Sequence, residues 1–307
     1  MSPTQRWTFA LKPASWPKLL VPAVLGQALG VRSAGGVSAA GLGVGALYTV
    51  AILVFIVLMN DWADEKVDRL KREMFPQGCS PKTIPDAILP ARSLLIVGSG
   101  AGLIAAAVAI AGSYALDRPA VAWMGTAGLL TFAAYTLPPL RMNYRGGGEL
   151  LEAFGVGFLL PSIQVEAQGG ALGQSEYAVL AGFAVISLAS AIASGLSDEQ
   201  SDKAGGKRTV ASMLGNSVAR VAVMLALVGG AASWVVAGFF IEPMRVALLG
   251  GASVVIFYAL KLRTLSSSAL TNEFEAQRRY KGVLHAAIWR GAVVLSALVL
   301  LERAIAI

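Results

Sequence analysis

A run of carboxylates that follows a long apolar stretch is the first place in this sequence where chemistry is expected. It reads Asn60-Asp61-Trp62-Ala63-Asp64-Glu65-Lys66-Val67-Asp68. Asp61, Asp64 and Asp68 stand at i, i+3 and i+7, so a helix that continues past Asn60 places the three carboxylates on one stripe. Like charges stacked in this way repel each other, and the repulsion grows beside a low-dielectric bilayer. A cation between them removes that repulsion, so the spacing predicts a cation site.

A second carboxylate cluster of the same form lies later in the chain. It reads Asp198-Glu199-Gln200-Ser201-Asp202, with Asp198 and Asp202 at i and i+4 on one helix face. Asp64-Glu65-x-x-Asp68 aligns with the second cluster at an offset of 134 residues. Each cluster is followed by a basic stretch, Lys82-Thr83 or Lys207-Arg208-Thr209. We infer two weakly similar halves, since membrane folds often contain repeats whose site lies between them.

The types of ligand favour a hard divalent cation. Side chains that offer only oxygen suit Mg²⁺, which prefers one or two carboxylates together with the phosphate oxygens of a substrate. The single histidine, His285, argues against His-based zinc or haem sites, and the single cysteine, Cys79, rules out an intramolecular disulfide. Two clusters that face each other would hold two or more Mg²⁺ ions on a diphosphate, with nearby Lys and Arg neutralising the remaining phosphate charge.

The elements that position these clusters are apolar helices. Of the 307 residues, 56% are hydrophobic and 14% are charged, against roughly 25% charged residues in a soluble domain. Apolar runs of about 20 residues, long enough to cross a bilayer, recur from end to end. We predict an all-α, multi-pass transmembrane bundle of about nine helices, with residues 1–307 in one domain. The predicted spans are 16–36, 41–60, 93–114, 119–137, 149–168, 176–195, 217–240, 243–262 and 283–303.

Basic residues lie mostly on one side of this nine-span arrangement. Most of the 25 Lys and Arg residues fall in the N-terminal segment and in loops on its side. The exceptions are Arg32, Arg118, Arg245 and Arg303 on the other side and Arg290 within the last span. By the positive-inside rule the N-terminus is cytoplasmic, so both carboxylate clusters lie on the cytoplasmic side of a cell (inner) membrane. The net charge of +7 thus indicates topology and anionic ligand or lipid contacts, and not nucleic-acid binding.

Two other interpretations fit the same residues. Acidic residues at a membrane boundary are commonly solvated loop residues, but two clusters of matching form on one side weigh against that interpretation. A cation-coupled multi-pass transporter also uses carboxylates, which typically lie in the middle of a span. Asp61 and Asp198 fall at span ends, which favours an enzyme that holds a lipid head group at the cytoplasmic rim and an isoprenoid tail among the apolar helices.

At these residues the chain resembles the UbiA superfamily of intramembrane prenyltransferases. Asn60-Asp61-x-x-Asp64-x-x-x-Asp68 matches the first aspartate-rich motif of the family, and Asp198-x-x-x-Asp202 matches the second. The segments 82–92, 135–149 and 202–209 extend the resemblance over nearly the whole chain. The last segment, Asp202-Lys203-Ala204-Gly205-Gly206-Lys207-Arg208-Thr209, is similar to the menaquinone branch, which joins a prenyl chain to 1,4-dihydroxy-2-naphthoate.

The resemblance implies an Mg²⁺-dependent transfer of a polyprenyl group from its diphosphate to a small aromatic acceptor. It implies that the five motif aspartates are catalytic and that Mg²⁺ is held by Asn60, Asp61, Asp64, Asp68, Asp198 and Asp202. The implied substrate-binding residues are Tyr135, Arg141, Tyr144, Arg145, Lys207 and Arg208. Cations stabilise the departing diphosphate in a dry site, and the rings of Tyr135 and Tyr144 flank the allylic cation. A role of these tyrosines as interfacial anchors stays open, as does a purely topological role of Arg141 and Arg145.

Three departures from the family pattern concern the acceptor. Asn60-Asp61-Trp62 is as similar to chlorophyll-synthase-like members as to the menaquinone branch, residues 71–80 lengthen the loop, and Ser194 stands where many menaquinone-branch members have asparagine. We expect 1,4-dihydroxy-2-naphthoate as the acceptor, with loss of its carboxylate during prenylation. A chlorophyll-type enzyme and a 4-hydroxybenzoate prenyltransferase are the alternatives within the same chemistry. The prenyl chain length and the oligomeric state do not follow from the sequence.

Overall fold

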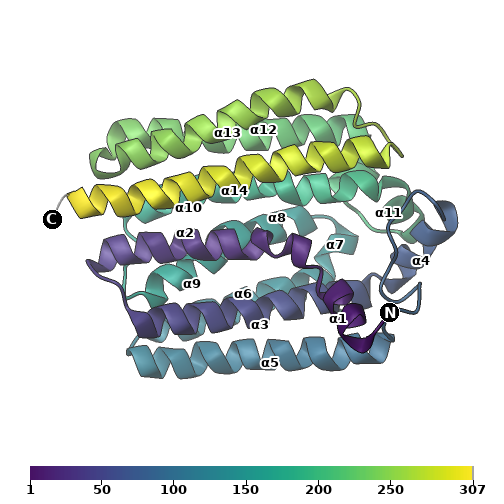
Figure 1. Ribbon diagram of the computed structural model, residues 1–307, viewed down its shortest axis with the longest axis horizontal. Helices are drawn as coiled ribbons and strands as arrows, with labels where there is room; N and C mark the ends of the chain where they lie inside the picture. Colours follow the sequence, from purple (N-terminus) through teal and green to yellow (C-terminus); the bar gives the residue numbers. More distant parts are fainter. Residues whose placement is uncertain (306–307) are drawn as a thin grey trace.

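Long apolar helices lie side by side and set the length of the molecule, as Figure 1 shows. The structure is a computed structural model that describes residues 1–305, and no β-strand occurs in that range. The long helices are α2 (Pro17–Ala34), α3 (Ala39–Ala63), α5 (Ala91–Leu116), α6 (Pro119–Thr136), α10 (Gln174–Ser194), α12 (Val210–Phe240), α13 (Arg245–Ser266) and α14 (Phe274–Ile305). One further segment is built from α8 (Gly148–Phe154), a π-helical turn (Gly155–Leu159) and α9 (Leu160–Ala167). The prediction of an all-helical bundle is confirmed.

These nine segments correspond one by one to the nine predicted spans. Among residues 1–305, seven segments are long and apolar enough to cross a membrane, and α2 and α6, with 18 residues each, are less apolar. The largest differences in boundary are at α12, which begins at Val210 and not at 217, and at α14, which begins at Phe274 and not at 283. The first turns of α14 carry Arg278, Arg279 and Lys281. Hydropathy marks only the apolar part of such a helix, so the polar turns beyond it escape a search for spans.

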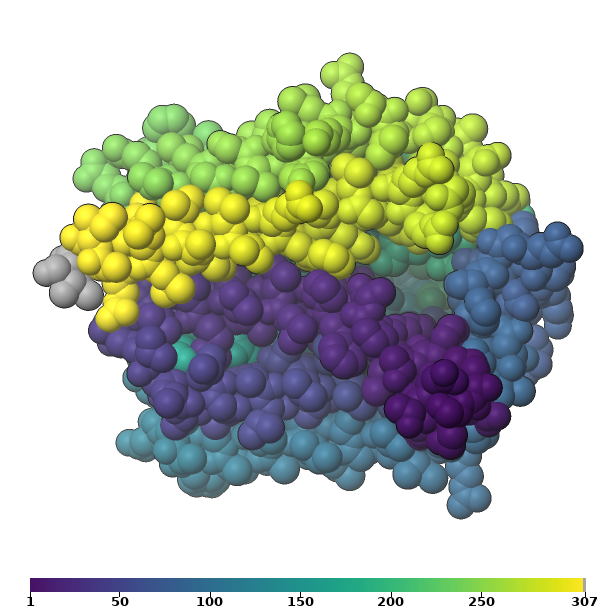
Figure 2. Space-filling model, in the orientation of Figure 1, coloured from purple at the N-terminus to yellow at the C-terminus, as the bar shows by residue number. Residues whose placement is uncertain are grey.

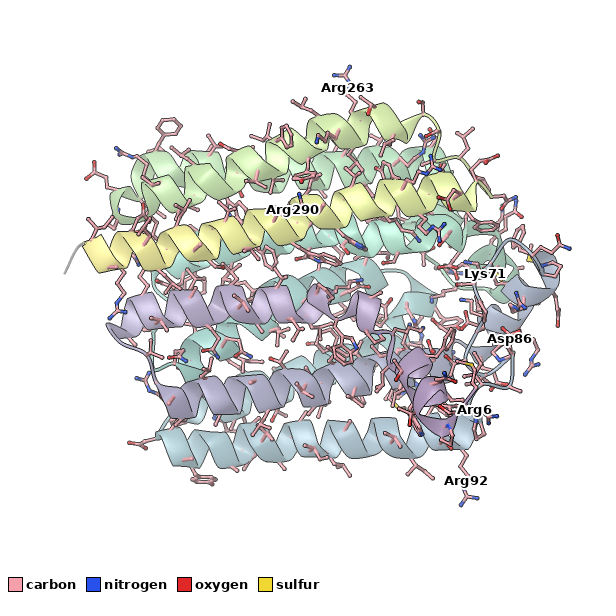
Figure 3. The ribbon with its side chains drawn as sticks, viewed as in Figure 1. Arg6, Lys71, Asp86, Arg92, Arg263 and Arg290 are labelled. Carbon is pink, nitrogen blue, oxygen red and sulfur yellow. The ribbon has the colours of Figure 1, made fainter. Side chains whose placement is uncertain are left out.

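Short helices gather at one end of the bundle, where the N-terminus also lies (Figure 1). They include α1 (Pro3–Leu11), α4 (Glu65–Met74) and α11 (Glu199–Gly205), and α4 packs against α11. A single turn, α7 (Met142–Arg145), connects α6 to α8. Figure 3 shows Arg6, Lys71, Asp86 and Arg92 at the same end of the bundle. The two carboxylate clusters run into the first turns of α4 and α11, so this end is where the site must form.

Close backbone contact joins α2 to α9. A Cβ atom added at Gly26 would lie 2.2 Å from the carbonyl oxygen of Pro161. Beside this contact, the side-chain amide of Gln27 donates to Gln164 Oε1 at 2.5 Å. Lipid tails are as apolar as leucine, so helices in a bilayer associate through close packing and hydrogen bonds between helices. The absence of a side chain at Gly26 therefore contributes directly to the stability of the bundle.

We expect Gly26→Ala to lower the thermal stability of the purified protein. The added methyl group overpacks the contact at a cost of about 1–3 kcal/mol, which exceeds the roughly 1 kcal/mol that alanine gains over glycine within a helix. The measurement is the unfolding midpoint in detergent, followed by size-exclusion chromatography after heating. The control is Gly100→Ala in α5, where an added Cβ meets nothing within 4 Å. Equal midpoints for the two variants would show that the contact between α2 and α9 yields without strain.

Candidate active site

The two carboxylate clusters line one cavity at the end of the bundle that carries α4 and α11. The cavity wall contains all six predicted metal ligands, which are Asn60, Asp61, Asp64, Asp68, Asp198 and Asp202. Tyr135 and Lys207, two of the predicted substrate-binding residues, line it as well. At this end, the molecular surface is hollowed between the yellow α14, the purple N-terminal segment and the blue segment that includes α4 (Figure 2). The fold thus brings both distant motifs to one cavity.

Each motif lies across a break of one residue between a long helix and a short one. α3 ends at Ala63, Asp64 has φ −92° and ψ 6°, and α4 begins at Glu65. The helix thus continues past Asn60 as far as Ala63, and Asp64 interrupts it before Asp68. Packing explains the break, because α4 bends to bury Val67 against α11. The carboxylates still share one side, since the backbone N–H of Asp64 continues to donate to the carbonyl of Asn60 at 2.9 Å.

The second motif repeats this backbone geometry. Asp198, with φ −115° and ψ 2°, separates a 3₁₀ turn (Gly195–Ser197) at the end of α10 from α11. Asp64 and Asp198, which align in the sequence, thus both adopt the sparsely populated bridge region of φ/ψ space, where many active-site residues lie. The two short helices that follow them pack on each other. This agreement supports the idea of two related halves, which stays a prediction.

Four of the five aspartates pair with a lysine that comes from a different element. The pairs are Lys12 with Asp61, Lys207 with Asp64, Lys82 with Asp68, and Lys71 with Asp198. The Nζ atom of Lys207 lies 2.7 Å from Asp64 Oδ2, and that of Lys82 lies 2.5 Å from Asp68 Oδ1. Of the four lysines, only Lys207 was predicted as a site residue. The other three could have been expected in general terms, because buried carboxylates require nearby cations. The sequence does not say, however, which lysines fold onto the aspartates.

The remaining aspartate, Asp202, titrates near neutral pH. Burial raises its pKa to about 7, and the negative charge of Asp198 acts in the same direction, against the opposing charge of Lys207. Burial also acts to raise the pKa of Asp198, but Lys71 and two further lysines outweigh it and hold that pKa below its usual range. The cavity therefore combines a firmly ionised carboxylate with one that readily takes a proton.

Tyr144 and Arg141 reach the first motif from outside the cavity. The Tyr144 hydroxyl donates to Asp64 Oδ1 at 3.0 Å. Burial, followed by the charge of Asp64, raises the pKa of Tyr144, so the phenol stays protonated and acts as a donor. The Arg141 guanidinium lies 4.0 Å from the centroid of the Tyr144 ring and donates to the carbonyl of Ala63 at 2.9 Å. In this structure both residues hold Asp64 in position and do not line the cavity.

Arg145 and Arg208 are exposed, and neither lines the cavity. Arg208 follows Lys207 in a non-helical stretch, and it is exposed whereas Lys207 lines the cavity. Arg145 ends the single turn of α7, whose buried residue is Asn143. The geometry does not bring these two arginines to the other predicted residues, and their substrate-binding role rests on the sequence resemblance alone.

The oxygen donors of the cavity suit Mg²⁺ in combination with a phosphorylated ligand. Within residues 1–305, no three His, Cys, Asp or Glu side chains form a preformed metal site. Mg²⁺ does not require one, because it commonly takes one or two carboxylates and completes its shell with water and substrate phosphates. Six oxygen-bearing side chains around one cavity meet that requirement. The arrangement therefore indicates that metal binds together with the substrate.

The raised pKa of Asp202 makes a specific prediction about stability in the absence of divalent metal. The folded protein favours the protonated form of Asp202. The stabilisation from this carboxyl group is therefore complete below its pKa in the unfolded chain, about 4. It is lost as the pH rises through its pKa in the folded protein, about 7. We expect the unfolding midpoint in EDTA to fall as the pH is raised over that interval. Asp202→Asn should remove part of the fall, because an amide does not titrate.

Asp117→Asn is the matched control for this measurement. Asp117 is exposed and lies at the C-terminal end of α5, and we expect its replacement to leave the pH dependence as in the unaltered protein. A pH dependence in Asp202→Asn equal to that of the unaltered protein would contradict the assignment.

Comparison with known proteins agrees with this geometry. A UbiA homolog from Archaeoglobus fulgidus bound to DMAPP and Mg²⁺ superposes with a TM-score of 0.68 at 15% sequence identity, over 95% of this chain and 99% of that chain. A UbiA homolog from Aeropyrum pernix K1 in its apo form gives 0.63 at 15% identity, over 89% of this chain and 96% of that chain. No curated protein matches the chain at a significant level. At these identities the structural matches show the shared fold.

The family follows from the sequence match. The model of the UbiA prenyltransferase family matches residues 19–279, which is most of the chain and includes both aspartate motifs. The chain therefore belongs to the UbiA prenyltransferase family.

Proposed function

We propose that this protein transfers a polyprenyl group from polyprenyl diphosphate to 1,4-dihydroxy-2-naphthoate, as in menaquinone biosynthesis. The observation that carries the proposal is the single cavity onto which both aspartate motifs open. Family membership supports the reaction class. The Archaeoglobus fulgidus homologs bound to DMAPP or GPP together with Mg²⁺ support the prenyl donor and the metal. The resemblance of residues 202–209 to the menaquinone branch supports the acceptor.

The cavity wall supplies the groups that a diphosphate requires. Mg²⁺ would be held by Asn60, Asp61, Asp64, Asp68, Asp198 and Asp202. When bound, Mg²⁺ neutralises charge on the diphosphate and makes it a better leaving group. Lys12, Lys82 and Lys207 line the same space and add positive charge for the phosphate oxygens. This charge counts most as the C–O bond breaks, because negative charge then builds up on the diphosphate.

The surroundings of the cavity suit an allylic cation that must not meet water. Tyr135 lines the cavity at the end of α6, and an aromatic face attracts a cation. The apolar interior of the bundle is the natural place for the prenyl tail and keeps solvent from the reacting carbon. The aromatic acceptor then attacks this carbon. With dihydroxynaphthoate, the carboxylate of the acceptor leaves as carbon dioxide.

We place the protein in the cell (inner) membrane, with the cavity on the cytoplasmic side. The end of the bundle that holds the cavity also carries Arg6, Lys71 and Arg92 (Figure 3). Loops rich in lysine and arginine stay in the cytoplasm. The cavity lies at this basic end and not midway along the spans, which disfavours the alternative of a cation-coupled transporter.

The deciding experiment is an assay of the purified protein with radiolabelled polyprenyl diphosphate, Mg²⁺ and competing acceptors. We expect label to enter dihydroxynaphthoate in preference to 4-hydroxybenzoate or a chlorophyll precursor, and no product in EDTA. Preference for another acceptor would move the protein to another branch of the family. Intact prenyl diphosphate with every acceptor, together with cation-coupled uptake in vesicles, would refute prenyl transfer.

Asp64→Ala and Asp198→Ala are the variants that accompany this assay. Each removes one carboxylate from the cavity, and we expect a loss of product of at least about 100-fold, the order found when a single transition-state contact is removed. The control is Asp117→Ala, because Asp117 lies at the far end of α5. Size-exclusion profiles equal to that of the unaltered protein would show that the fold survives. Full activity in either cavity variant would contradict the assignment.

Orientation is tested with single cysteines in a Cys79→Ser background. Gln77→Cys lies in the loop after α4 at the cavity end, and Val37→Cys lies between α2 and α3 at the opposite end, where Val37 is 70% exposed. In intact spheroplasts, we expect a membrane-impermeant maleimide to label Val37→Cys and to spare Gln77→Cys. Inverted vesicles should give the reverse pattern. Labelling of Gln77→Cys from outside would place the cavity on the wrong side.

A further inference from the structure

Residues 71–80, which are the end of α4 and the lengthened loop after it, fold against the start of α14. The rings of Phe75 and Phe274 meet edge to face, with centroids 5.1 Å apart. Gly78 lies on the same ring of α14, because a Cβ atom added at Gly78 would come within 2.9 Å of the Phe274 side chain. The loop and the first turns of α14 thus form two walls of a pocket, which we call the Lys281 pocket.

The Lys281 pocket is roomy and carries an excess of positive charge. Its volume is about 500 Å³, compared with about 190 Å³ for the cavity that both aspartate motifs line. Lys71 contributes to its wall from α4, and Arg278 and Lys281 contribute from α14. The acidic side chain in this wall is Glu275. Three cations beside one carboxylate favour an anionic ligand.

Lys281 directs its ammonium group at a neutral partner. The side chain is half-buried, and its Nζ atom donates to Ser197 Oγ at 2.8 Å. Within residues 1–305, no ion pair includes Lys281. Removing a cation from water without a counter-charge costs free energy. An anion in the pocket would offset this cost.

Arg278 is available to the same ligand. Its ion pair with Glu275 is highly exposed, with the two side chains 78% and 55% exposed, and such pairs contribute little to stability. Glu275 also pairs with Arg279, at 3.2 Å. Arg278 can therefore turn to a ligand while Glu275 keeps a cationic partner.

One ion pair joins the pocket to the cavity of the aspartate motifs. Lys71, which lines the pocket, pairs with Asp198, which lines the cavity. Ser197, the residue before Asp198, lines the pocket. The two spaces are therefore neighbours, and an anion in the pocket competes with Asp198 for the ammonium group of Lys71.

We propose that the Lys281 pocket is a second anion site, outside the cavity of the aspartate motifs, and that its ligand is inorganic diphosphate. Lys71, Arg278 and Lys281 donate charge-assisted hydrogen bonds to the phosphate oxygens. The motif aspartates repel a diphosphate unless metal lies between them, whereas the basic wall of the pocket binds the anion without Mg²⁺.

The number of charges favours diphosphate as the ligand. The carboxylate of an aromatic acceptor carries one negative charge and would leave two of the three cations without a partner. Diphosphate carries enough charge for all three. The source of this ion rests on the proposed prenyl transfer, which releases diphosphate in the neighbouring cavity. The anion chemistry of the pocket does not depend on that reaction.

The single cysteine of the chain reports on the pocket directly, because Cys79 lines it. The experiment measures the rate at which N-ethylmaleimide, an uncharged reagent, alkylates Cys79 in the purified protein in EDTA. Inorganic diphosphate is titrated against potassium chloride of equal ionic strength. We expect diphosphate to slow the alkylation to a saturating limit and chloride to leave it unchanged. Inorganic phosphate, with fewer charges, should protect only at higher concentration.

Arg278→Gln and Arg279→Gln form a matched pair of variants. Each removes one positive charge from the same turn and one partner from Glu275, but only Arg278 lines the pocket. We expect Arg278→Gln and Lys281→Gln each to weaken the protection by diphosphate about 10-fold or more, as expected for the loss of a hydrogen bond to a charged group. Arg279→Gln should match the unaltered protein. If Lys281→Gln does not fold, Arg278→Gln decides the test, because its side chain is exposed.

Three results would overturn the inference. In the first, diphosphate leaves the alkylation of Cys79 unchanged. In the second, Arg278→Gln and Arg279→Gln weaken the protection equally, which would show only a general attraction of anions to this end of the molecule. In the third, inorganic phosphate protects at lower concentration than diphosphate, which would exclude diphosphate as the preferred ligand.

The outcome also separates this inference from the proposed function. The alkylation assay requires no turnover, so its failure would leave prenyl transfer standing. A complete lack of prenyl transfer with every acceptor would refute the proposed function, whereas saturable protection of Cys79 would still show the anion site.

Discussion

Mutual repulsion among carboxylates at a membrane boundary is the constraint on which the rest of this structure depends. Five aspartates and an asparagine line one cavity beside an apolar bundle, and the low dielectric of that setting makes unpaired negative charge costly. Lysines from the N-terminal segment, from α4, and from the loops after α4 and α11 balance four of the aspartates. The same charge pattern suits a ligand that carries both phosphate and metal.

Long and short helices have different roles in meeting this constraint. Long helices held by glycine contacts, such as that of Gly26 with Pro161, provide a rigid frame. At Asp64 and Asp198 the helices break and the chain changes direction, so that α4 and α11 pack on each other at the end of the frame. The frame determines where the motifs lie, and the breaks determine which way their carboxylates face.

Polarity changes with depth along the inner faces of α8 and α10. Glu149 and Ser194 belong to the charged cavity, whereas Glu152 and Ser190, one turn further in, belong to a pocket walled by aromatic side chains. Adjacent turns of the same two helices therefore face surroundings of different polarity.

The sequence by itself determined the all-helical membrane fold and the two motifs, because apolar runs and carboxylate spacing are local properties that a chain displays directly. The reaction class came from the resemblance of these motifs to a known family. Only the tertiary structure decided that Lys12, Lys71 and Lys82 complete the site, and that Arg145 and Arg208 lie exposed outside it. The direction of a side chain depends on how distant segments pack. The break at Asp64 has the same origin, since the contact of α4 with α11 overrides a local sequence that would continue the helix.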